Sequence, residues 1–291
     1  MLAAEARELG GEAKGKGASE RAGQPASPPE SPSLGGGERP RQLPEWDALP
    51  YGDDGWVLAH DSIRHGMALI KTTVGGMLRE HVLGGRAQSW MGTHLQSYFD
   101  FLCTWVHHHH DNEEQLVFPA MHKKFPVPAK LSADHGTLIQ MLDESARNLR
   151  ALAKGLTEGA ADKELLRLID VFVEQFAAME AEMRSHLREE EEIALPLLRA
   201  HFTRAEMHAI EAEILKHITP LEIAFFLAPK DDAFKWRWMR SVAGIPYPVV
   251  KFVLFPAARR GGLYDRELGV LLSDINSGSR SSDKPQACVI A

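Results

Sequence analysis

Apolar residues recur at spacings of three and four along four long stretches in the middle of the chain. This period matches an amphipathic α-helix that buries one face. The stretches run over residues 56–83, 93–124, 132–156 and 162–201, and glycine or proline residues separate them. Because short links join long amphipathic helices, neighbouring helices are expected to run antiparallel. The pattern therefore predicts an all-α protein built on an antiparallel up-down four-helix bundle over residues 56–201.

The segments outside the predicted bundle differ from it in composition. Residues 1–42 are rich in glycine and proline and are predicted to be disordered, because they bury too little apolar surface to offset chain entropy. Residues 43–55 form a predicted arm whose aromatic side chains are available to dock. Residues 202–273 form a C-terminal helical extension, in which a capping box opens a helix predicted to continue to about Leu227. Residues 274–291 are rich in serine and are predicted to be a flexible tail.

Two of the predicted helices carry the same arrangement of polar residues. In each copy a histidine is followed by two glutamates at positions +4 and +5 and by a proline at position +10. The copies begin at His109 and His186, which are 186 − 109 = 77 residues apart. The first and third helices each contribute one histidine, His60 and His135, at nearly the same separation. The bundle is therefore interpreted as two similar helix pairs, each of which supplies one histidine and one His-x-x-x-Glu pair.

Helical phase places six of these side chains on the faces that are predicted to be buried. A histidine and a glutamate four residues apart lie one turn apart on the same side of a helix, where a ring nitrogen and a carboxylate oxygen can reach one cation. Core histidines are commonly satisfied by hydrogen bonds. A buried carboxylate without a partner is costly, however, and no lysine or arginine shares the stripe. We therefore predict a metal site formed by His60, His109, Glu113, His135, His186 and Glu190.

The residues next to these predicted ligands leave alternatives open. Glu114 and Glu191 directly follow the two predicted glutamate ligands and are rivals to them. The run of four histidines contains one predicted ligand, and its other members, His107, His108 and His110, are expected to point to other faces of the helix. The remaining histidines are interpreted as surface or packing residues.

At these residues the chain resembles the hemerythrin family, in its broad form called the HHE cation-binding domain. The resemblance covers about residues 56–201, and all four helices contribute their motifs in the family's order. It implies a four-helix bundle around two iron ions, Fe²⁺ or Fe³⁺, joined by an oxo or hydroxo bridge, with dioxygen as the ligand. It also implies terminal nitrogen ligands and two bridging carboxylates, which fall here on His60, His109, His135, His186, Glu113 and Glu190.

One family feature is missing from its usual place. Oxygen-carrying hemerythrins have a fifth histidine one turn from the histidine of the third helix, where this chain has Leu131 and Ile139. A set of four histidines and two glutamates is more similar to intracellular hemerythrin-like domains, which include one in an iron-sensing ubiquitin-ligase subunit. The resemblance therefore implies metal binding, whereas reversible carriage of oxygen does not follow from it.

The predicted donor set favours iron, and it favours binding over turnover. Imidazole and carboxylate donors suit iron, zinc or manganese, and no thiolate is available. Di-iron oxidases of the ferritin type use four carboxylates and two histidines, which is the inverse ratio. We therefore predict a non-haem di-iron protein that binds or senses dioxygen, another small diatomic ligand, or iron. The alternatives are a di-iron enzyme (a ferroxidase, a peroxidase or a nitric-oxide-reducing enzyme) and a zinc-stabilised interaction module.

Composition and charge limit the partners and the compartment. Lysine and arginine number 33 against 40 aspartates and glutamates, and this net charge of −7 argues against nucleic-acid binding. Two cysteines in 291 residues cannot form a disulfide framework, which favours a reducing, cytoplasmic location. No apolar run is long enough to span a membrane, and no feature of the sequence indicates a particular protein partner.

The last four residues form a C-a-a-X sequence, and the final alanine suggests that a farnesyl group is attached to Cys288. One lipid gives marginal membrane affinity, so a second signal is expected for a tether to the cytosolic face of a membrane. Residues 234–240 mix cations with Trp236 and Trp238, as interfacial helices do. The preferred alternative is that both tryptophans pack on the bundle.

Overall fold

The computed structural model describes residues 41–241 and 245–281, and these two ranges contain helices and no β-strand. Residues 1–40, 242–244 and 282–291 lie outside the described residues. These ranges include nearly all of the segment predicted to be disordered, and they include the whole C-a-a-X sequence. The predicted all-α class is confirmed for the described part of the chain. None of the described helices is long and apolar enough to cross a membrane.

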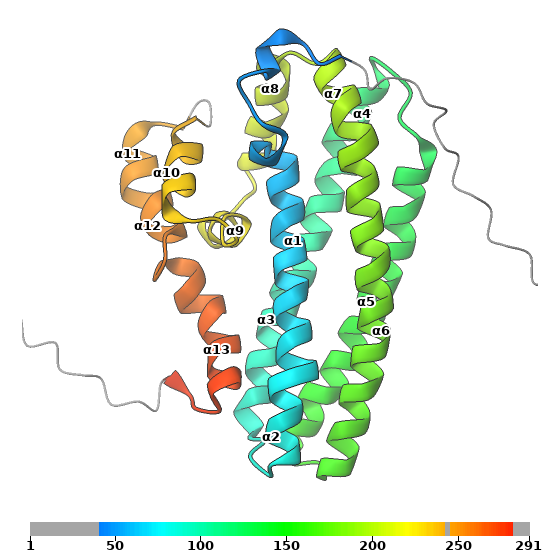
Figure 1. Cartoon of the computed structure of the whole chain (residues 1–291), viewed down its shortest axis with the longest axis vertical. Coiled ribbons are helices and arrows are strands. Elements are labelled where there is room, and N and C mark those ends of the chain that lie inside the picture. Colours follow the sequence, from blue (N-terminus) through cyan, green and yellow to red (C-terminus); the bar gives the residue numbers. More distant parts are fainter. Residues whose placement is uncertain (1–40, 242–244, 282–291) are drawn as a thin grey trace, which may run out of the picture. The chain divides into compact units, whose positions relative to one another are not determined.

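The four-helix bundle predicted from the hydrophobic pattern is present. Its rods are α1 and α2 (Gly55–Thr72 and Arg79–Leu83), α3 and α4 (Ser89–Asn112 and Phe118–His122), α5 (Ala129–Glu158), and α6 and α7 (Asp162–Glu189 and Leu195–His201). In three rods a π-helical turn joins the two helices without a break. α1 packs against α3 and α6, and α5 packs against the same two helices (Figure 1). Short links make consecutive rods antiparallel.

A proline accompanies a π-helical turn at three places in the chain. The turns Glu113–Val117, Glu190–Ala194 and Val250–Leu254 are each followed, after one residue, by a proline. Proline has no N–H, and its ring clashes with the carbonyl group four residues back, so a wider turn relieves both problems. In both copies of the polar arrangement the turn begins at the first glutamate. The glutamate and the apolar residue that ends the turn are then both buried.

The C-terminal extension consists of short helices. They are α8 (Arg204–Leu215), α9 (Pro220–Phe226), α10 (Asp232–Ser241), α11 (Tyr247–Val249), α12 (Phe255–Ala258) and α13 (Val270–Ser277). α9 packs on α1, and α13 packs on α3 (Figure 1). The predicted capping box at Thr203 is present, but its helix ends at Leu215, so the expectation that it continues to Leu227 is wrong. A second capping box, formed by Thr219 and Glu222, begins α9 instead.

Hydrogen bonds tie both ends of the described chain to the bundle. Trp46 of the arm is buried, and its indole N–H donates to the carbonyl oxygen of Phe202 at 2.7 Å. At the other end, α13 extends to Ser277, beyond residue 274, where the flexible tail is predicted to begin. The reason is that Ile275 is fully buried and its carbonyl oxygen lies 2.7 Å from His81 Nε2.

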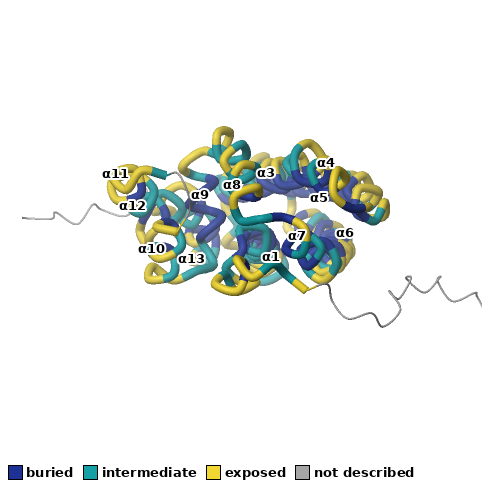
Figure 2. The backbone as a smooth tube through the Cα atoms, turned by 90° about the horizontal axis from the view of Figure 1, so that it is seen from above, coloured by how far each residue is buried: buried dark blue, intermediate teal, exposed yellow. Residues whose placement is uncertain are grey.

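Apolar side chains fill the bundle on both sides of a buried polar layer. One hydrophobic cluster reaches Val106 on α3 and Leu187 on α6, and a second begins at Val117 and Ala194. Between them on these two rods lie buried polar side chains, His109, His110 and Glu113 on one and Glu190 on the other. Figure 2 shows that the buried parts of the bundle helices face its interior. The two clusters therefore separate the polar layer from water above and below. Polar groups in such a layer need partners, because burial without them is costly.

Candidate metal centre

Seven buried polar side chains meet between the two hydrophobic clusters. α1 and α5 supply one each, α3 and its π-helical turn supply three, and α6 and its turn supply two. None is more than 8% exposed. They are His60, His109, His110, Glu113, His135, His186 and Glu190. The bundle therefore brings together all six ligands predicted from the sequence and adds one histidine.

Four of these side chains form a first group, in which one ligand atom of each lies within 4.8 Å of the others: His60, His109, Glu113 and Glu190. His109 Nε2 lies 3.2 Å from Glu113 Oε1, one helical turn away. His60 Nε2 lies 3.3 Å from Glu190 Oε2 and 3.9 Å from Glu113 Oε1. Atoms that bind one metal at right angles with bonds of about 2.1 Å lie ~3 Å apart. The spacing of the first group therefore suits a single cation.

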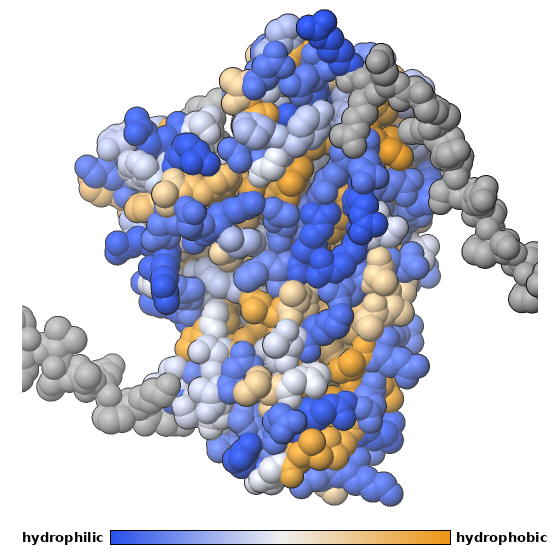
Figure 3. Space-filling view, in the orientation of Figure 1, coloured by the Kyte–Doolittle hydropathy of each residue, from blue (hydrophilic) through white to orange (hydrophobic). Residues whose placement is uncertain are grey.

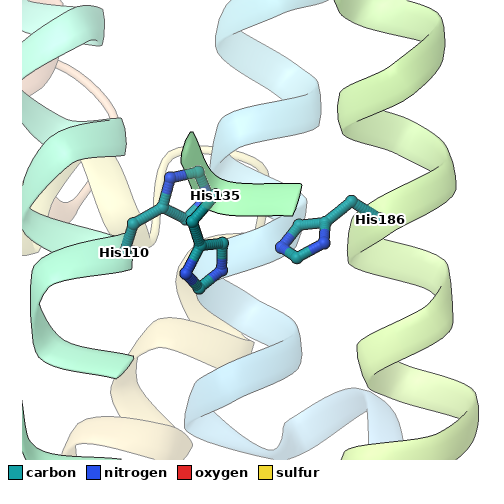
Figure 4. Close-up of side chains that lie close together, drawn as sticks. All are labelled: His110, His135 and His186. Atoms are coloured by element: carbon teal, nitrogen blue, oxygen red, sulfur yellow. The ribbon is translucent and has the colours of Figure 1, made fainter. Parts of the chain in front are cut away.

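Three histidines form a second group on the other side of the carboxylates: His110, His135 and His186. Figure 4 shows their rings converging from three helices. The rings of His110 and His135 are stacked with centroids 4.3 Å apart, and His186 meets His135 edge-on at 4.7 Å. The nitrogen atoms of this group could hold a second cation.

The two buried carboxylates face both groups of histidines. Glu113 directs Oε1 toward His109, and its Oε2 lies 3.4 Å from His135 Nε2. Glu190 directs Oε2 toward His60, and its Oε1 lies 3.2 Å from His186 Nε2 and 3.5 Å from His135 Nε2. Each carboxylate thus presents one oxygen to each group. A carboxylate that bridges two metal ions has this arrangement.

The expectation that His110 points to another face of its helix is wrong, because the side chain is only 3% exposed. Adjacent residues on a helix of 3.6 residues per turn point about 100° apart. His109 therefore faces α1, whereas His110 faces α5 and α6. The sequence did contain a signal for this position, because Val106, His110, Glu113 and Val117 follow one another at spacings of four, three and four.

The rival glutamates, Glu191 and Glu114, contact the outer nitrogen atoms of two histidines. Glu191 Oε1 lies 2.8 Å from His60 Nδ1, and Arg64 donates to the same oxygen at 2.7 Å. Glu114 Oε1 lies 2.7 Å from His135 Nδ1. A carboxylate in this position fixes the tautomer and orientation of a metal-binding imidazole. The second glutamate of each copy therefore supports a histidine on another helix, while the first turns inward.

Most of the inward-facing donor atoms have no hydrogen-bond partner among the described residues. This is true of Nε2 of all five histidines, of Glu113 Oε2 and of both carboxylate oxygens of Glu190. Some of them lie 3.2–3.5 Å apart, but not with hydrogen-bonding geometry. Leaving a buried polar atom unpaired costs about 1–3 kcal/mol. Cations at the centre of the cluster would satisfy these atoms together, and imidazole with carboxylate suits iron, zinc or manganese.

A comparison with known families agrees with this geometry. The family model of the hemerythrin HHE cation binding domain matches residues 52–198, half of the chain. The chain belongs to the hemerythrin HHE cation-binding family. All seven buried donors lie within this hemerythrin domain, and α8 to α13 lie outside it. Searches of curated proteins and of solved structures gave no match.

Burial and charge pairing inside the hemerythrin domain shift pKa values in opposite directions. Burial lowers the pKa of His135, but its interactions with Glu113 and Glu190 outweigh burial and raise this pKa to about 10. The pKa of His60 is raised for the same reason. Burial lowers the pKa of His109 to about 4, against a weaker effect of Glu113. Burial and Glu190 raise the pKa of Glu113, but the neighbouring histidines lower it further, to about 2. In the metal-free cluster at neutral pH, Glu113 is therefore ionised, and the raised pKa values of His60 and His135 favour their protonated forms.

Metal binding is expected to release protons from the hemerythrin domain and to strengthen as pH rises. A ring nitrogen that carries a proton cannot bind a metal, so His60 and His135 must lose theirs. Because the pKa of His135 is raised to about 10, this competition is present at neutral pH and weakens as pH rises toward that value. Calorimetric titration with zinc in two buffers of different ionisation enthalpy measures the protons released, and we expect at least one per chain at neutral pH. Zero release would show that both rings are already neutral.

Proposed function

We propose that the hemerythrin domain binds two iron ions and uses them to bind or sense dioxygen. The observation that carries this proposal is the position of the two carboxylates, each with one oxygen directed at each group of histidines. A single cation would leave one group with unpaired buried donors, which is unfavourable. Two cations that share both carboxylates leave none of the inward-facing donors without a partner.

The proposed ligands divide unevenly between two positions. The two-histidine position has His60 and His109, the three-histidine position has His110, His135 and His186, and Glu113 and Glu190 are shared. This set contains five histidines, one more than the set predicted from the sequence. Because the two-histidine position has one nitrogen donor fewer, a small ligand such as dioxygen is expected to bind there.

The iron pair would supply the redox chemistry, and the chain sets the conditions under which it acts. Trp56 donates its indole N–H to Glu113 Oε1 at 2.5 Å, which holds this carboxylate in place. The two hydrophobic clusters exclude water, and electrostatic interactions are stronger where water is excluded. Two carboxylates stabilise ferric and higher states less than the four of ferritin-type sites, which favours binding over oxidative turnover.

Reconstitution with ferrous iron in the absence of oxygen, followed by admission of dioxygen, tests the proposal. We expect two iron ions per chain by metal analysis, one for each position. We also expect a visible absorption that appears when dioxygen is admitted. A colourless protein that holds less than one metal ion per chain would contradict the proposal.

Two other outcomes would support a different function. Continuous consumption of dioxygen, peroxide or nitric oxide that is lost in Glu113→Ala would support a di-iron enzyme, such as a ferroxidase, a peroxidase or a nitric-oxide-reducing enzyme. Zinc as the single metal of the native protein would support a zinc-stabilised interaction module.

Replacement of His110 by alanine is expected to lower the iron content from two ions per chain to one. The three-histidine position would lose a nitrogen donor, whereas the two-histidine position would keep both of its histidines. Metal analysis after gel filtration measures the change. His107→Ala is the matched control, because this neighbouring side chain is 39% exposed and lies outside the cluster. Two tightly bound irons in His110→Ala would show that His110 is not a ligand.

We also propose that the chain is cytoplasmic and is tethered to a membrane by a farnesyl group on Cys288, which lies outside the described residues. Packing argues against Trp236 and Trp238 as the second membrane signal. The Trp238 indole N–H donates to the carbonyl oxygen of Asp53 at 3.0 Å, and the ring of Trp236 lies 4.8 Å from that of Phe255. Both tryptophans therefore have partners within the protein.

Residues 247–253 are a better candidate for the second signal. Phe252 is 70% exposed and Tyr247 54% exposed, with Lys251 beside them. Hydrophilic residues predominate on the face in Figure 3, and apolar residues form several separate patches on it. Exposed apolar residues next to a cation favour contact with an anionic lipid surface. Mass spectrometry of the C-terminus from eukaryotic cells tests the lipid, and an intact Ala291 with unmodified Cys288 would contradict it.

A further inference from the structure

A large cavity lies beside the two-histidine position. Its volume is about 470 Å³, and its wall includes His109, Glu113 and Trp56. Among the described residues that line it, none is a histidine of the three-histidine position. The cavity therefore approaches the cluster from one side only, where one nitrogen donor fewer is available.

The other side of the cluster has a different and smaller cavity. This second cavity has a volume of about 160 Å³, and its wall includes His186, Asp134 and Lys130. Lys130 forms ion pairs with Asp134 and Glu189, so charged side chains line the second cavity. The cavity on the two-histidine side is thus the larger of the two, and it differs from the second cavity in the residues that line it.

Four tryptophan rings line the large cavity, and each indole N–H already has an acceptor inside the protein. The donor and acceptor pairs are Trp46 with Phe202, Trp56 with Glu113, Trp105 with Ser62, and Trp238 with Asp53. With their N–H groups used elsewhere, the rings offer carbon surface to a ligand. Aliphatic side chains add to this surface, so the cavity suits an apolar molecule.

Charge on the wall disfavours ionic ligands of either sign. No lysine or arginine lines the cavity within the described residues, so an organic anion would find no such cation to pair with. Asp54 is already paired with Arg199 at 2.8 Å. Burial, together with Asp54, raises the pKa of Glu211 to about 7, so this carboxyl group is protonated much of the time and can donate a hydrogen bond. The other two carboxylates of the wall are Glu113, which already contacts Trp56 and His109, and Asp111, which is exposed to solvent. An organic cation therefore also lacks an unpaired carboxylate in the interior.

The C-terminal extension builds a large part of the wall. Three of its helices place large apolar side chains on the cavity wall: α8 with Met207, Ile210 and Ile214, α9 with Phe226, and α10 with Trp238. Of the 24 lining residues, 11 lie outside residues 52–198, which match the hemerythrin family. The cavity is therefore a feature that this chain adds to the hemerythrin domain.

We propose that the cavity binds an uncharged organic molecule with an apolar body and one hydroxyl or similar polar group, and that one end of this molecule reaches the two-histidine position. The volume lies within the range of about 300–1,000 Å³ that is usual for small-molecule sites. Contact with a metal at this position rests on the proposed function, whereas binding in the cavity does not.

Three ligands with the same alkyl chain and different charge test the chemistry of the cavity. They are octan-1-ol, octylammonium and octanoate, each titrated calorimetrically into the full-length, metal-free protein. We expect saturable binding of octan-1-ol to one site and at least tenfold weaker binding of both ions. Tighter binding of octanoate or octylammonium than of octan-1-ol would overturn the uncharged assignment, and no binding of octan-1-ol would overturn the proposal.

A pair of substitutions locates the binding site. Ile214→Trp fills the cavity from α8 and is expected to weaken octan-1-ol binding at least tenfold. Leu83→Trp is the matched control, because Leu83 is 61% exposed and does not line the cavity. Thermal unfolding shows whether each variant is folded, and Ile210→Phe is the substitute if Ile214→Trp is not. Unchanged binding in a folded cavity variant would place the ligand elsewhere.

Spectroscopy of the iron-loaded protein tests contact with the two-histidine position. Octan-1-ol is expected to shift the visible absorption of the iron-loaded protein. Binding without any shift would overturn the contact. If iron does not bind but octan-1-ol still binds the metal-free protein, the proposed function fails and the cavity proposal stands.

Discussion

Replacement of Glu190 by leucine is expected to abolish the binding of both metal ions. Glu190 is fully buried and directs one oxygen to each group of histidines, so its loss removes a ligand from both positions. Leucine removes the charge and both oxygen donors while keeping a side chain of similar size. Metal analysis after reconstitution with ferrous iron measures the result, and we expect a change from two ions per chain to none.

The neighbouring residue provides a matched control for this prediction. Glu191→Gln is expected to retain two metal ions per chain with about 10- to 100-fold weaker affinity, because Glu191 contacts the outer nitrogen of His60. The two variants thus separate a shared ligand from a supporting residue. Two bound metal ions in Glu190→Leu would show that Glu190 is not a shared ligand. Loss of both ions in Glu191→Gln would show that Glu191 does more than support His60.

Removal of metal is expected to lower the free energy of unfolding by about 8 kcal/mol. The comparison is with metal-loaded protein in which the free metal is at about 1,000 times the dissociation constant of each site. Each site contributes about 4.1 kcal/mol under this condition, because a ligand that binds only the folded state stabilises it. The physical source is the set of buried donors that have no partner inside the protein. Urea denaturation with and without metal, the latter after chelation, measures the difference.

The Glu190→Leu variant is also the control for the stability prediction. Its unfolding is expected not to respond to metal. Because Glu190 is one of the carboxylates that raise the pKa of His60 and His135, its removal breaks buried charge pairs, and the metal-free variant is expected to be less stable than the metal-free parent. The same denaturation midpoint for the parent chain with and without metal would contradict a stabilising metal pair.

The main features of the fold follow from local sequence pattern. Hydrophobic spacing predicts the four rods, because the period of a helix is set by its own backbone hydrogen bonds and not by its neighbours. The same period predicts that Glu113 and Glu190 share the buried faces with His109 and His186. The prediction of one continuous helix to Leu227 is wrong because Thr219 and Glu222 form a second capping box, which begins a new helix at Pro220.

Residue spacing along the chain is enough to predict the four rods of the bundle and the face of each rod that carries His60, His109, His135 and His186, because both follow from the helical period. Three features depend instead on how the helices pack: His110 joins the cluster, Glu191 contacts His60, and α8 and α9 line a cavity beside Glu113. Residue spacing gives the direction of a side chain about its own helix axis. What lies in that direction depends on the positions and rotations of the neighbouring helices, and these are set by packing between residues far apart in the chain.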